Sequence, residues 1–318
     1  MSTNPWKTEI VFYEALEPIH VGAGGYRLGR VDNTICREPG TGLPKIPGTS
    51  LAGASRAYAA LAYGKPEASG QHKKMTVEMR DKCPILFTFG TATDQTGGFA
   101  GKVAFGDAHI VFFPVATMAG PVWVSTPEIL QSWFKMEATK NSISDENTLR
   151  VSTGLSTLKQ LNLGWILFHS PQSREGTPIP ATLPVKISKN LVLVHSSIFP
   201  QIVNSNLEVR TSVSINHETG AAEDGALFTY EAIPRETIFG QEIVEDCFMP
   251  KDGIFDVKTQ WSRPNGATVP EAIEPPWTSP LDVAIAGLRL IDPLGVGGMG
   301  TRGFGRMKMV VPAAKGVV

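Results

Sequence analysis

The sequence predicts an α+β fold with an antiparallel sheet, and three observations carry that prediction. Segments that read as strands are not regularly separated by segments that read as helices, which disfavours a doubly wound fold. The 32 glycines and 24 prolines predict many turns and long irregular connections. Hydrophobic residues at 42% and charged residues at 19% are typical of a globular chain. With 318 residues, one large domain with insertions and two fused units both remain open, and no repeat of about 20 to 50 residues occurs.

Two strands and two helices are predicted in the first half of the chain. The strand segments are rich in β-forming side chains that partly alternate, and the helix segments carry apolar residues at helical spacing behind a cap. Thr49 or Ser50 is the expected N-cap of the first helix, and the second begins with a proline at its first helical position. The predicted elements are a strand over residues 7–17, a helix over 49–63, a strand over 102–115 broken near Gly106, and a helix over 126–138.

The second half of the chain is less regular, and residues 140–190 are poorly patterned. The clearest hairpin is predicted over residues 207–234, where two alternating runs flank a polar loop with glycines that we expect to project into solvent. A serine cap followed by proline and an apolar stripe predicts a helix over 279–291. The remaining expectations are a strand over 189–194, a short helix within 196–206 and a last strand over 306–311.

Charge and cysteine content limit the class of protein. The net charge is −1 and the pI about 6.6, whereas a free-standing nucleic-acid binder is usually more basic. An RNA-binding role therefore requires cations focused on one face. The three cysteines are far apart and form no CxxC pair, which fits reduced thiols and disfavours a structural zinc site. With no apolar run of membrane-spanning length and no signal-peptide core at the N-terminus, we expect a cytoplasmic protein without a membrane partner.

Residues 31–56 combine the acid Asp32 with cations and a helix start. The unpaired amides at the beginning of a helix and the helix dipole favour an anion, so this end is a candidate phosphate site. Ordinary helix capping is the alternative. For Asp32 the alternative to a catalytic role is a turn-forming residue, since "VDN" is good turn chemistry.

Two glycine-rich loops are further candidates. The first, "HVGAGGYRLGR", runs over residues 20–30, and its His20 is either a hydrogen-bonded core residue or part of an RNA groove. The second, "GVGGMGTRGFGR", runs over 295–306 and contains GxGxxG. A dinucleotide fingerprint must follow a strand and open a helix, but these glycines follow a predicted helix and precede a strand. Two interpretations remain, a flexible turn and a loop whose missing side chains and free amides let a polyanion approach.

Four blocks of the sequence, taken together, resemble the RAMP superfamily, the CRISPR-associated Cas7 proteins. They are residues 20–56 with "PGTSLAG", residues 105–127, residues 213–239 and the glycine-rich residues 295–305. The second and third blocks are similar to the Cmr4-type subunits of type III-B effector complexes, whose type III-A counterpart is Csm3. Two departures from the family pattern stand out. Ala52 occupies a position where the family often has lysine, so one phosphate contact is in doubt, and Cys36 reads as a small core-facing residue rather than a nucleophile.

The resemblance implies a fold and an assembly. It implies one Cas7/RAMP domain over residues 1–318, with an RRM-like (ferredoxin-like) palm, inserted fingers and a protruding thumb β-hairpin at about 207–234. Copies would stack head to tail along a guide crRNA, beside subunits resembling Cas10, Cmr3, Cmr5, Cmr6 and Cmr1, in antiviral defence. Leu227 and Phe228 of the thumb could wedge against an unstacked base. The alternative is an edge hairpin packed on its own subunit.

The resemblance also implies an activity, a divalent-metal-dependent endoribonuclease (Mg²⁺ or Mn²⁺) that cuts complementary target RNA at regular intervals. Asp32 would be the catalytic residue and metal ligand. Scission by the RNA's own 2′-hydroxyl agrees with this, because it needs in-line geometry, a base and charge neutralisation but no protein nucleophile. The alternatives are a non-catalytic guide-binding Cas7 subunit and a Cas6-like processing endonuclease that relies on His20. The candidate RNA-binding residues are His20, Gly22, Arg27, Arg30, Arg37, Lys45, Gly48, Thr49, Ser50, Arg56, Arg302 and Arg306.

Overall fold

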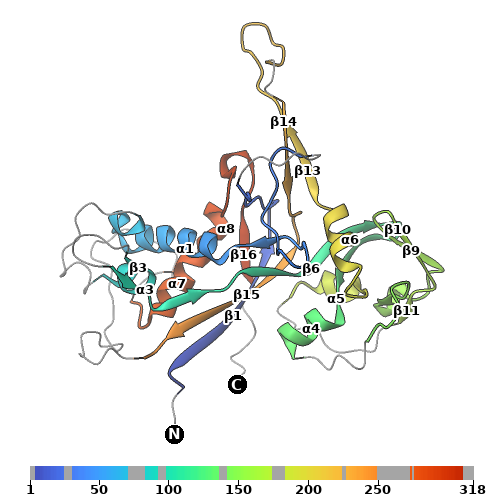
Figure 1. Ribbon diagram of the computed structural model, residues 1–318, viewed down its shortest axis with the longest axis horizontal. Coiled ribbons are helices and arrows are strands. Elements are labelled where there is room, and N and C mark those ends of the chain that lie inside the picture. The colour runs from blue at the N-terminus through green and yellow to red at the C-terminus, as the bar shows by residue number, and fades with distance from the viewer. Residues whose placement is uncertain are drawn as a thin grey trace.

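A mixed ten-stranded sheet forms the centre of the computed structural model (Figure 1). The structure describes residues 4–24, 31–70, 83–91, 98–135, 142–173, 183–223, 227–248, 273 and 276–310. Eight strands follow one another in the order β11-β8-β12-β7-β6-β15-β1-β16, with β2 beside β6 and β5 beside β15. These strands are β1 (Trp6–Ala15), β2 (Lys45–Ile46), β5 (Val103–Phe105), β6 (Ala108–Thr117), β7 (Gly120–Ser125), β8 (Arg150–Val151), β11 (Gln172–Ser173), β12 (Leu191–Leu193), β15 (Ile238–Asp246) and β16 (Met307–Val310).

The predicted α+β class is confirmed, but the predicted antiparallel sheet is only partly right. The long strands β1, β6 and β15 pair antiparallel. Two pairs, β12 with β7 and β11 with β8, are parallel. Both involve strands of two or three residues in or next to residues 140–190, which are too short to show a period. Three two-stranded sheets complete the strands: β3 (Gly90–Thr91) with β4 (Phe99–Ala100), β9 (Gln160–Leu163) with β10 (Ile166–His169), and β13 (Glu208–Ser212) with β14 (Phe228–Ala232).

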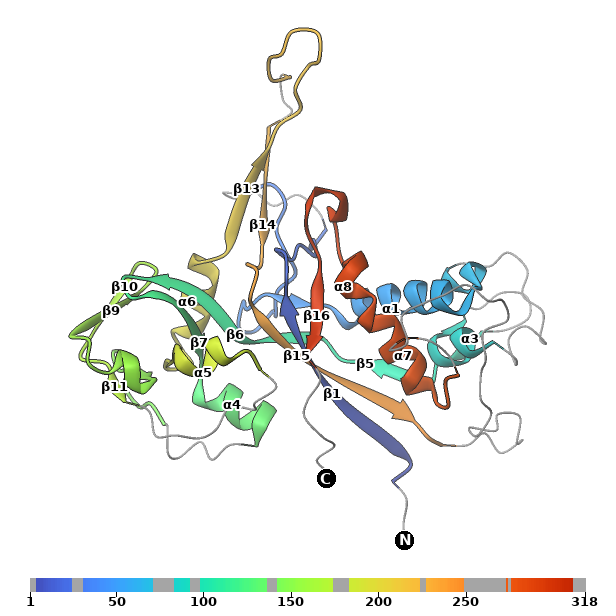
Figure 2. The same cartoon turned by 180° about the vertical axis from the view of Figure 1, so that it is seen from behind.

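Helices gather at the two ends of the sheet, as both ribbon views show (Figure 2). At one end α1 and α7 cross so closely that a Cβ on Gly287 would lie 2.1 Å from the Ser55 carbonyl oxygen. The four predicted helices have counterparts in α1, α4, α6 and α7, whereas the other, mostly shorter, helices were not predicted. Residues 136–138 of the predicted 126–138 helix lie outside the described residues. The helices are α1 (Gly48–Tyr63), η1 (Pro66–Ser69), α3 (Pro84–Phe89), α4 (Pro127–Phe134), η3 (Thr153–Leu155), α5 (Val185–Lys189), α6 (Phe199–Ser205), α7 (Pro280–Arg289), α8 (Ile291–Leu294) and η5 (Gly300–Arg302).

Two of the three predicted helix caps are present. The hydroxyl of Thr126 caps α4, and Ser279 forms a capping box with Asp282 at the start of α7. The predicted Thr49 or Ser50 cap of α1 is wrong. This helix begins one residue earlier, and the amide of Gly48 donates instead to the Asp107 carboxylate at 2.7 Å.

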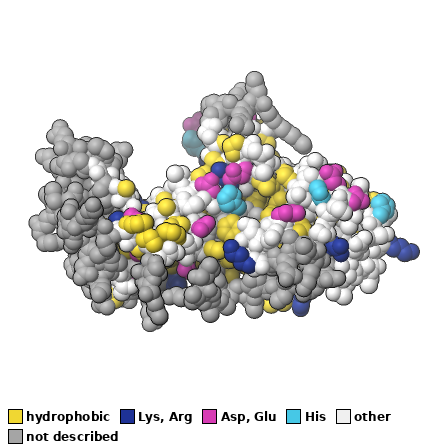
Figure 3. Space-filling model, turned by 60° about the horizontal axis from the view of Figure 1, so that its bottom comes forward, with side chains coloured by type: hydrophobic (Ala, Val, Ile, Leu, Met, Phe, Trp, Pro, Cys, Tyr) yellow, Lys and Arg dark blue, Asp and Glu magenta, His cyan; other side chains and the backbone are white. Residues whose placement is uncertain are grey.

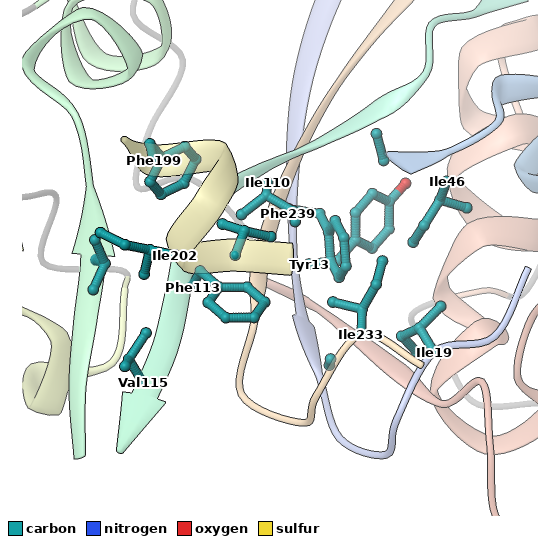
Figure 4. Close-up of a cluster of buried hydrophobic side chains, with 14 of the residues drawn as sticks. Tyr13, Ile19, Ile46, Ile110, Phe113, Val115, Phe199, Ile202, Ile233 and Phe239 are labelled. Carbon is teal, nitrogen blue, oxygen red and sulfur yellow. The ribbon is translucent and has the colours of Figure 1, made fainter. Parts of the chain in front are cut away.

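A large cluster of buried apolar side chains holds the sheet and its flanks together (Figure 4). Phe199 and Ile202 of α6 meet Phe113 of β6 on one side. Tyr13 of β1 and Phe239 of β15, both fully buried, come from neighbouring strands in the middle of the sheet. Burying side chains of this size stabilises the fold by roughly 1.5–3 kcal/mol each, so this cluster fixes the platform from which the hairpin rises.

The β13–β14 hairpin stands out from the body in both ribbon views. It pairs antiparallel from Glu208 with Ala232 to Ser212 with Phe228, within the predicted range. Beyond that pairing, Ile215 and Ala222 form an isolated bridge near a turn at Asn216. In the part of the chain that the structure describes, no helix is both long and apolar enough to cross a membrane.

Candidate functional site

Three distant segments meet at the base of the β13–β14 hairpin. Asn33 lies along β14 as a short parallel neighbour, since its amide donates to the Thr229 carbonyl and its carbonyl accepts from the Glu231 amide, both at 3.0 Å. Ile19 exchanges two backbone hydrogen bonds with Ile233, at the other end of β14. The glycine-rich loop over 295–305 packs against the same region through Phe304. Residues 19–24 and 31–37, β14 and this loop therefore form one junction, which we call the hairpin base.

Asp32 is held at the hairpin base by Thr229. One carboxylate oxygen, Oδ2, accepts from the Thr229 amide at 2.7 Å and from the Thr229 hydroxyl at 2.9 Å. The Asp32 amide in turn donates to the Thr229 hydroxyl oxygen at 3.1 Å. The Thr229 amide first, and its hydroxyl second, lower the pKa of Asp32 below its ordinary value. The side chain is exposed, and its other oxygen, Oδ1, has no hydrogen bond to a described residue. Asp32 thus presents one ionised oxygen to solvent.

Arg37 fastens the same segment to two neighbouring elements. Its guanidinium forms an ion pair with Glu231 of β14 at 2.9 Å and donates to the Asn204 side chain of α6 at 3.1 Å. A third bond goes to the Ile35 carbonyl. Most of the N–H groups of the Arg37 guanidinium therefore donate to residues of this chain, although the sequence suggested a phosphate contact.

His20 lies beneath the glycine-rich loop and is only 5% exposed. Its Nδ1 lies 2.6 Å from the Glu231 carbonyl oxygen, and because a carbonyl only accepts, Nδ1 carries the proton. A Cβ on Gly22 or Gly298 would sit 3.5 or 3.6 Å from the ring. Of the two interpretations from sequence, the hydrogen-bonded core histidine describes this environment.

The glycines of the second loop are needed for packing. Gly297 has a φ of +85°, and a Cβ there would lie 2.4 Å from the His20 carbonyl oxygen. The amide of Gly298 donates to that same oxygen, and the amide of Gly305 donates to Pro18. The loop follows α8 and precedes β16, which is the wrong order for a dinucleotide site. Several of the amides that the sequence suggested for phosphate are therefore already bonded.

An aromatic cluster with two arginines completes the hairpin base. Tyr230 meets Phe304 edge-on with ring centroids 5.4 Å apart, and Phe228 lies 6.0 Å from Tyr230. Arg210 lies over Phe304 and Arg302 over Phe228, at 4.8 and 5.6 Å from the ring centroids. Arg302 is exposed and has no ion pair with any described residue. Of the two predicted wedge residues, Phe228 is thus half-buried under an arginine, whereas Leu227 is 66% exposed.

The predicted residues near the α1 start are mostly engaged with the rest of the chain. Lys45 pairs with Asp107 at 2.6 Å and with Glu38 at 3.1 Å. Its Asp107 partner also accepts from Gly48, so a protein carboxylate occupies the predicted anion site. Thr49 is exposed, and the Ser50 amide donates to the Pro47 carbonyl.

Two other predicted cations also have partners in the chain, and two cannot be placed. Arg56 is half-buried and donates to Ala68, and burial lowers its pKa. The Arg306 guanidinium donates to both the backbone carbonyl and the carboxylate of Asp292. The predicted Arg27 and Arg30 lie outside the described residues. On the face in Figure 3, the coloured Lys and Arg side chains stand apart rather than forming one patch.

The reasoning from sequence missed Thr229, Arg210 and Phe304. Strand alternation over 228–232 is the one signal that could have suggested that Thr229 lies on the opposite face of the strand from its aromatic neighbours.

Among the described residues, no three His, Cys, Asp or Glu side chains lie close enough to hold a metal ion together. The three cysteines are free, and burial raises the pKa of the Cys36 thiol, which fits its predicted inert role.

Comparison with known proteins adds a family and a set of similar folds. The sequence profile of the RAMP superfamily matches residues 12–308. A curated relative from Pyrococcus furiosus, the CRISPR system Cmr endoribonuclease Cmr4, is 28% identical over 253 residues, which cover 73% of this chain and 80% of the relative.

Solved structures with similar folds include two states of the type III-B Cmr-beta complex. A chain of the complex bound to cognate target RNA aligns with a TM-score of 0.63 and 19% identity, covering 96% of this chain and 97% of the other. A chain of the apo state gives 0.61 and 19%, covering 95% and 96%. Oligomeric Cmr4 from Pyrococcus furiosus gives 0.57 and 19%, covering 97% and 100%.

Proposed function

Because this chain belongs to the RAMP superfamily, we propose that it is a Cmr4-like Cas7 backbone subunit of a type III CRISPR effector complex. In this role it binds a guide crRNA and cleaves the complementary target RNA. One observation carries the catalytic part: an exposed, ionised carboxylate, Asp32, is fixed at the base of a projecting hairpin. The name of the Pyrococcus furiosus relative, an endoribonuclease, supports the same activity.

The proposal assigns parts of the fold to RNA. The central sheet serves as the RRM-like palm of one Cas7/RAMP domain, and the β13–β14 hairpin serves as the thumb. Leu227, exposed just beyond the paired part of the hairpin, is the better placed of the two wedge residues. Phe228 instead supports the base through Arg302.

In the proposed reaction the 2′-oxygen of the target RNA attacks the adjacent phosphorus and the bond to the 5′-oxygen breaks. The 2′-hydroxyl proton leaves to a base, and a proton is delivered to the departing 5′-oxygen. A carboxylate whose pKa is lowered is a weak proton acceptor, so Asp32 is better suited to orienting the reacting groups than to taking the proton. Its free Oδ1 faces solvent, where a ribose or a hydrated ion can reach it.

A divalent ion, Mg²⁺ or Mn²⁺, fits this site only in a limited way. Asp32 offers one free oxygen, and no cluster of three ligating side chains occurs among the described residues. Mg²⁺ commonly keeps several waters and binds through one or two carboxylates plus substrate phosphates, so a single aspartate is compatible with it. A bound ion would supply a more acidic water and positive charge near the phosphate. The task of this chain would be to hold Asp32 in place.

The predicted RNA-binding residues fall into two groups, those that are exposed and those whose polar groups already bind other residues of the chain. Arg302, Thr49 and Leu227 are exposed and are the first candidates for direct contact. Gly22 is also exposed, Ser50 follows Thr49 in α1, and Arg27 and Arg30 remain predictions. Residues that already bind the chain are assigned to shaping the site; they are His20, Arg37, Lys45, Gly48, Arg56 and Arg306.

The proposal includes an assembly of copies of this chain, head to tail along the guide, in the cytoplasm with the other type III subunits. A non-catalytic guide-binding Cas7 subunit is the second candidate. It is favoured by the engagement of Arg37 with Glu231, because that ion pair occupies the cation nearest to Asp32 in sequence among the described residues. In that case the Asp32–Thr229 contact would only stabilise the hairpin base.

The test is a cleavage assay on the assembled, guide-loaded complex with end-labelled complementary RNA. With Mg²⁺ we expect a ladder of regularly spaced products that disappears with a chelator. The chemistry above predicts 5′-hydroxyl ends and 2′,3′-cyclic phosphate ends. Tight target binding without any ladder would favour the non-catalytic subunit.

A further inference from the structure

We propose that Thr229 is a positioning residue that ties the Asp32 carboxylate to the hairpin, so that the place of the hairpin on RNA sets the place of the carboxylate. This inference rests on the proposed function, because it assigns Asp32 to cleavage. It adds Thr229, from a distant part of the sequence, to the proposed site. It also links the hairpin, which is assigned to the duplex, to the Asp32 carboxylate, which is assigned to the target strand.

The contact fixes the orientation of the Asp32 side chain. Both donors of Thr229 converge on one carboxylate oxygen, at 2.7 and 2.9 Å. The hydroxyl also accepts from the Asp32 amide at 3.1 Å, so the two residues bind each other in both directions. An exposed aspartate would otherwise rotate among several rotamers. With Oδ2 held, Oδ1 points to a defined place outside the chain.

The contact also fixes the carboxylate relative to the hairpin. Thr229 lies opposite Thr211 in the β13–β14 register, one residue from the last pair of the ladder, Ser212 with Phe228. The carboxylate is therefore attached where the hairpin leaves the body. On the same strand, Glu231 holds Arg37 through its carboxylate and His20 through its carbonyl. Residues 20–24 and 31–37 are thus tied to β14 at several points, and a shift of the hairpin base would carry Asp32 with it.

This link has a consequence for the reaction. Cleavage through the 2′-hydroxyl requires the attacking oxygen, the phosphorus and the leaving oxygen to lie in line, and a misplacement of about 1 Å can cost about a hundredfold in rate. If the hairpin displaces a base pair, the kinked phosphate lies at a fixed distance from the hairpin. A carboxylate attached to the same strand then meets that phosphate and no other, which gives one cut for each hairpin.

The experiment compares wild type, Thr229→Val, Thr229→Ser, Thr211→Val and Asp32→Asn in the guide-loaded complex. Valine keeps the branched shape of Thr229 but removes the hydroxyl, and serine keeps the hydroxyl. Thr211 is the matched control, because it is exposed and lies directly opposite on β13. For each complex we would measure the target affinity, the single-turnover cleavage rate at saturating target, and the cut positions.

We expect Thr229→Val to lower the cleavage rate by about tenfold to a hundredfold and to spread the cuts over neighbouring phosphates, with target affinity unchanged. Serine should restore the rate and the cut positions, and Thr211→Val should behave as wild type. A purely structural role would instead reduce assembly and affinity. If Thr229→Val does not assemble, Thr229→Ala removes the same hydroxyl without adding a buried methyl group and carries the same expectation.

Two results overturn different claims. Wild-type rate and cut positions in Thr229→Val, in a complex whose activity is lost with Asp32→Asn, would overturn the positioning role alone. Wild-type cleavage by Asp32→Asn would overturn the proposed catalytic function, whatever Thr229 does.

Discussion

Asp32 and Thr229 are separated by 197 residues in the sequence and joined by three hydrogen bonds of 2.7 to 3.1 Å. The carboxylate assigned to chemistry is thereby attached to the hairpin assigned to the duplex. Because both ends of this contact are at the surface, it does little for overall stability and is better understood as fixing a geometry. Glycines, an ion pair and an exposed cation, at this junction and elsewhere in the fold, can each be tested by substitution.

Replacing Gly297 by alanine should destabilise the protein by about 2–4 kcal/mol. The new Cβ would lie 2.4 Å from the His20 carbonyl oxygen, and the residue has a φ of +85°. Unfolding in urea measures the effect. Gly300→Ala in the same loop is the control, since a Cβ there would meet nothing within 4 Å. Equal stability of the two variants would mean that packing does not explain the glycine.

Replacing Gly287 by alanine should cost roughly 2–4 kcal/mol, because the backbones of α1 and α7 would have to separate. The added Cβ would lie 2.1 Å from the Ser55 carbonyl oxygen. Gly53→Ala, in α1 with open space around it, should instead stabilise the helix by about 0.5–1 kcal/mol. Thermal unfolding of both variants separates these opposite signs, and a stabilised Gly287→Ala protein would contradict the close crossing.

Asp107→Asn should lower the free energy of unfolding at neutral pH by about 1–2 kcal/mol, through loss of the Lys45 pair and a weaker helix cap. Burial acts to raise the pKa of Asp107, but the bonds from Lys45 and Gly48 outweigh it and the pKa is lowered. The contribution of the ionised carboxylate is therefore complete above its unfolded-state pKa, about 3.9. It is lost as pH falls through the lower folded-state pKa.

The unfolding free energies of wild type and Asp107→Asn, measured from neutral to acidic pH, should therefore differ near pH 7 and converge below about pH 4. A constant difference throughout that range would show that the charge of Asp107 contributes nothing, and that the substitution changed only the shape of the side chain.

Arg302→Ala should weaken guide RNA binding and make its salt dependence shallower, by about 0.7 in the log–log slope for each phosphate that a copy no longer neutralises. Arg302 is exposed and has no ion pair among the described residues. Arg306 already binds Asp292 at 3.3 Å, so Arg306→Ala is the matched control and should change the slope less. Filter binding over a salt series measures both, and equal slopes for wild type and Arg302→Ala would remove Arg302 from the interface.

Much of the fold could be predicted because its signals are local. The start of α7 needs only the Ser279 hydroxyl, a proline and Asp282, which are neighbours in the sequence. The hairpin over 207–234 shows its alternation and turn residues directly. The short strands β8 and β11 could not be predicted, because two residues have no period and gain their pairing from the sheet around them.

The site was predictable only in part, for a related reason. Asp32 was singled out through the resemblance to the RAMP superfamily and its role stays a prediction, but its partner Thr229 lies on a distant strand and no local pattern connects them. The same is true of Asp107, which caps α1 from 59 residues away. For the glycine-rich loop, the sequence shows which side chains are missing but not that the His20 backbone fills the space.

The cleavage ladder of Asp32→Asn in the guide-loaded complex is the decisive experiment. Asparagine keeps the size of the side chain and an oxygen for Thr229 but removes the charge. We expect single-turnover cleavage to fall by at least about a hundredfold, with target RNA still bound as tightly as by wild type. A ladder of wild-type rate and spacing would show that Asp32 is not the centre of a ribonuclease site.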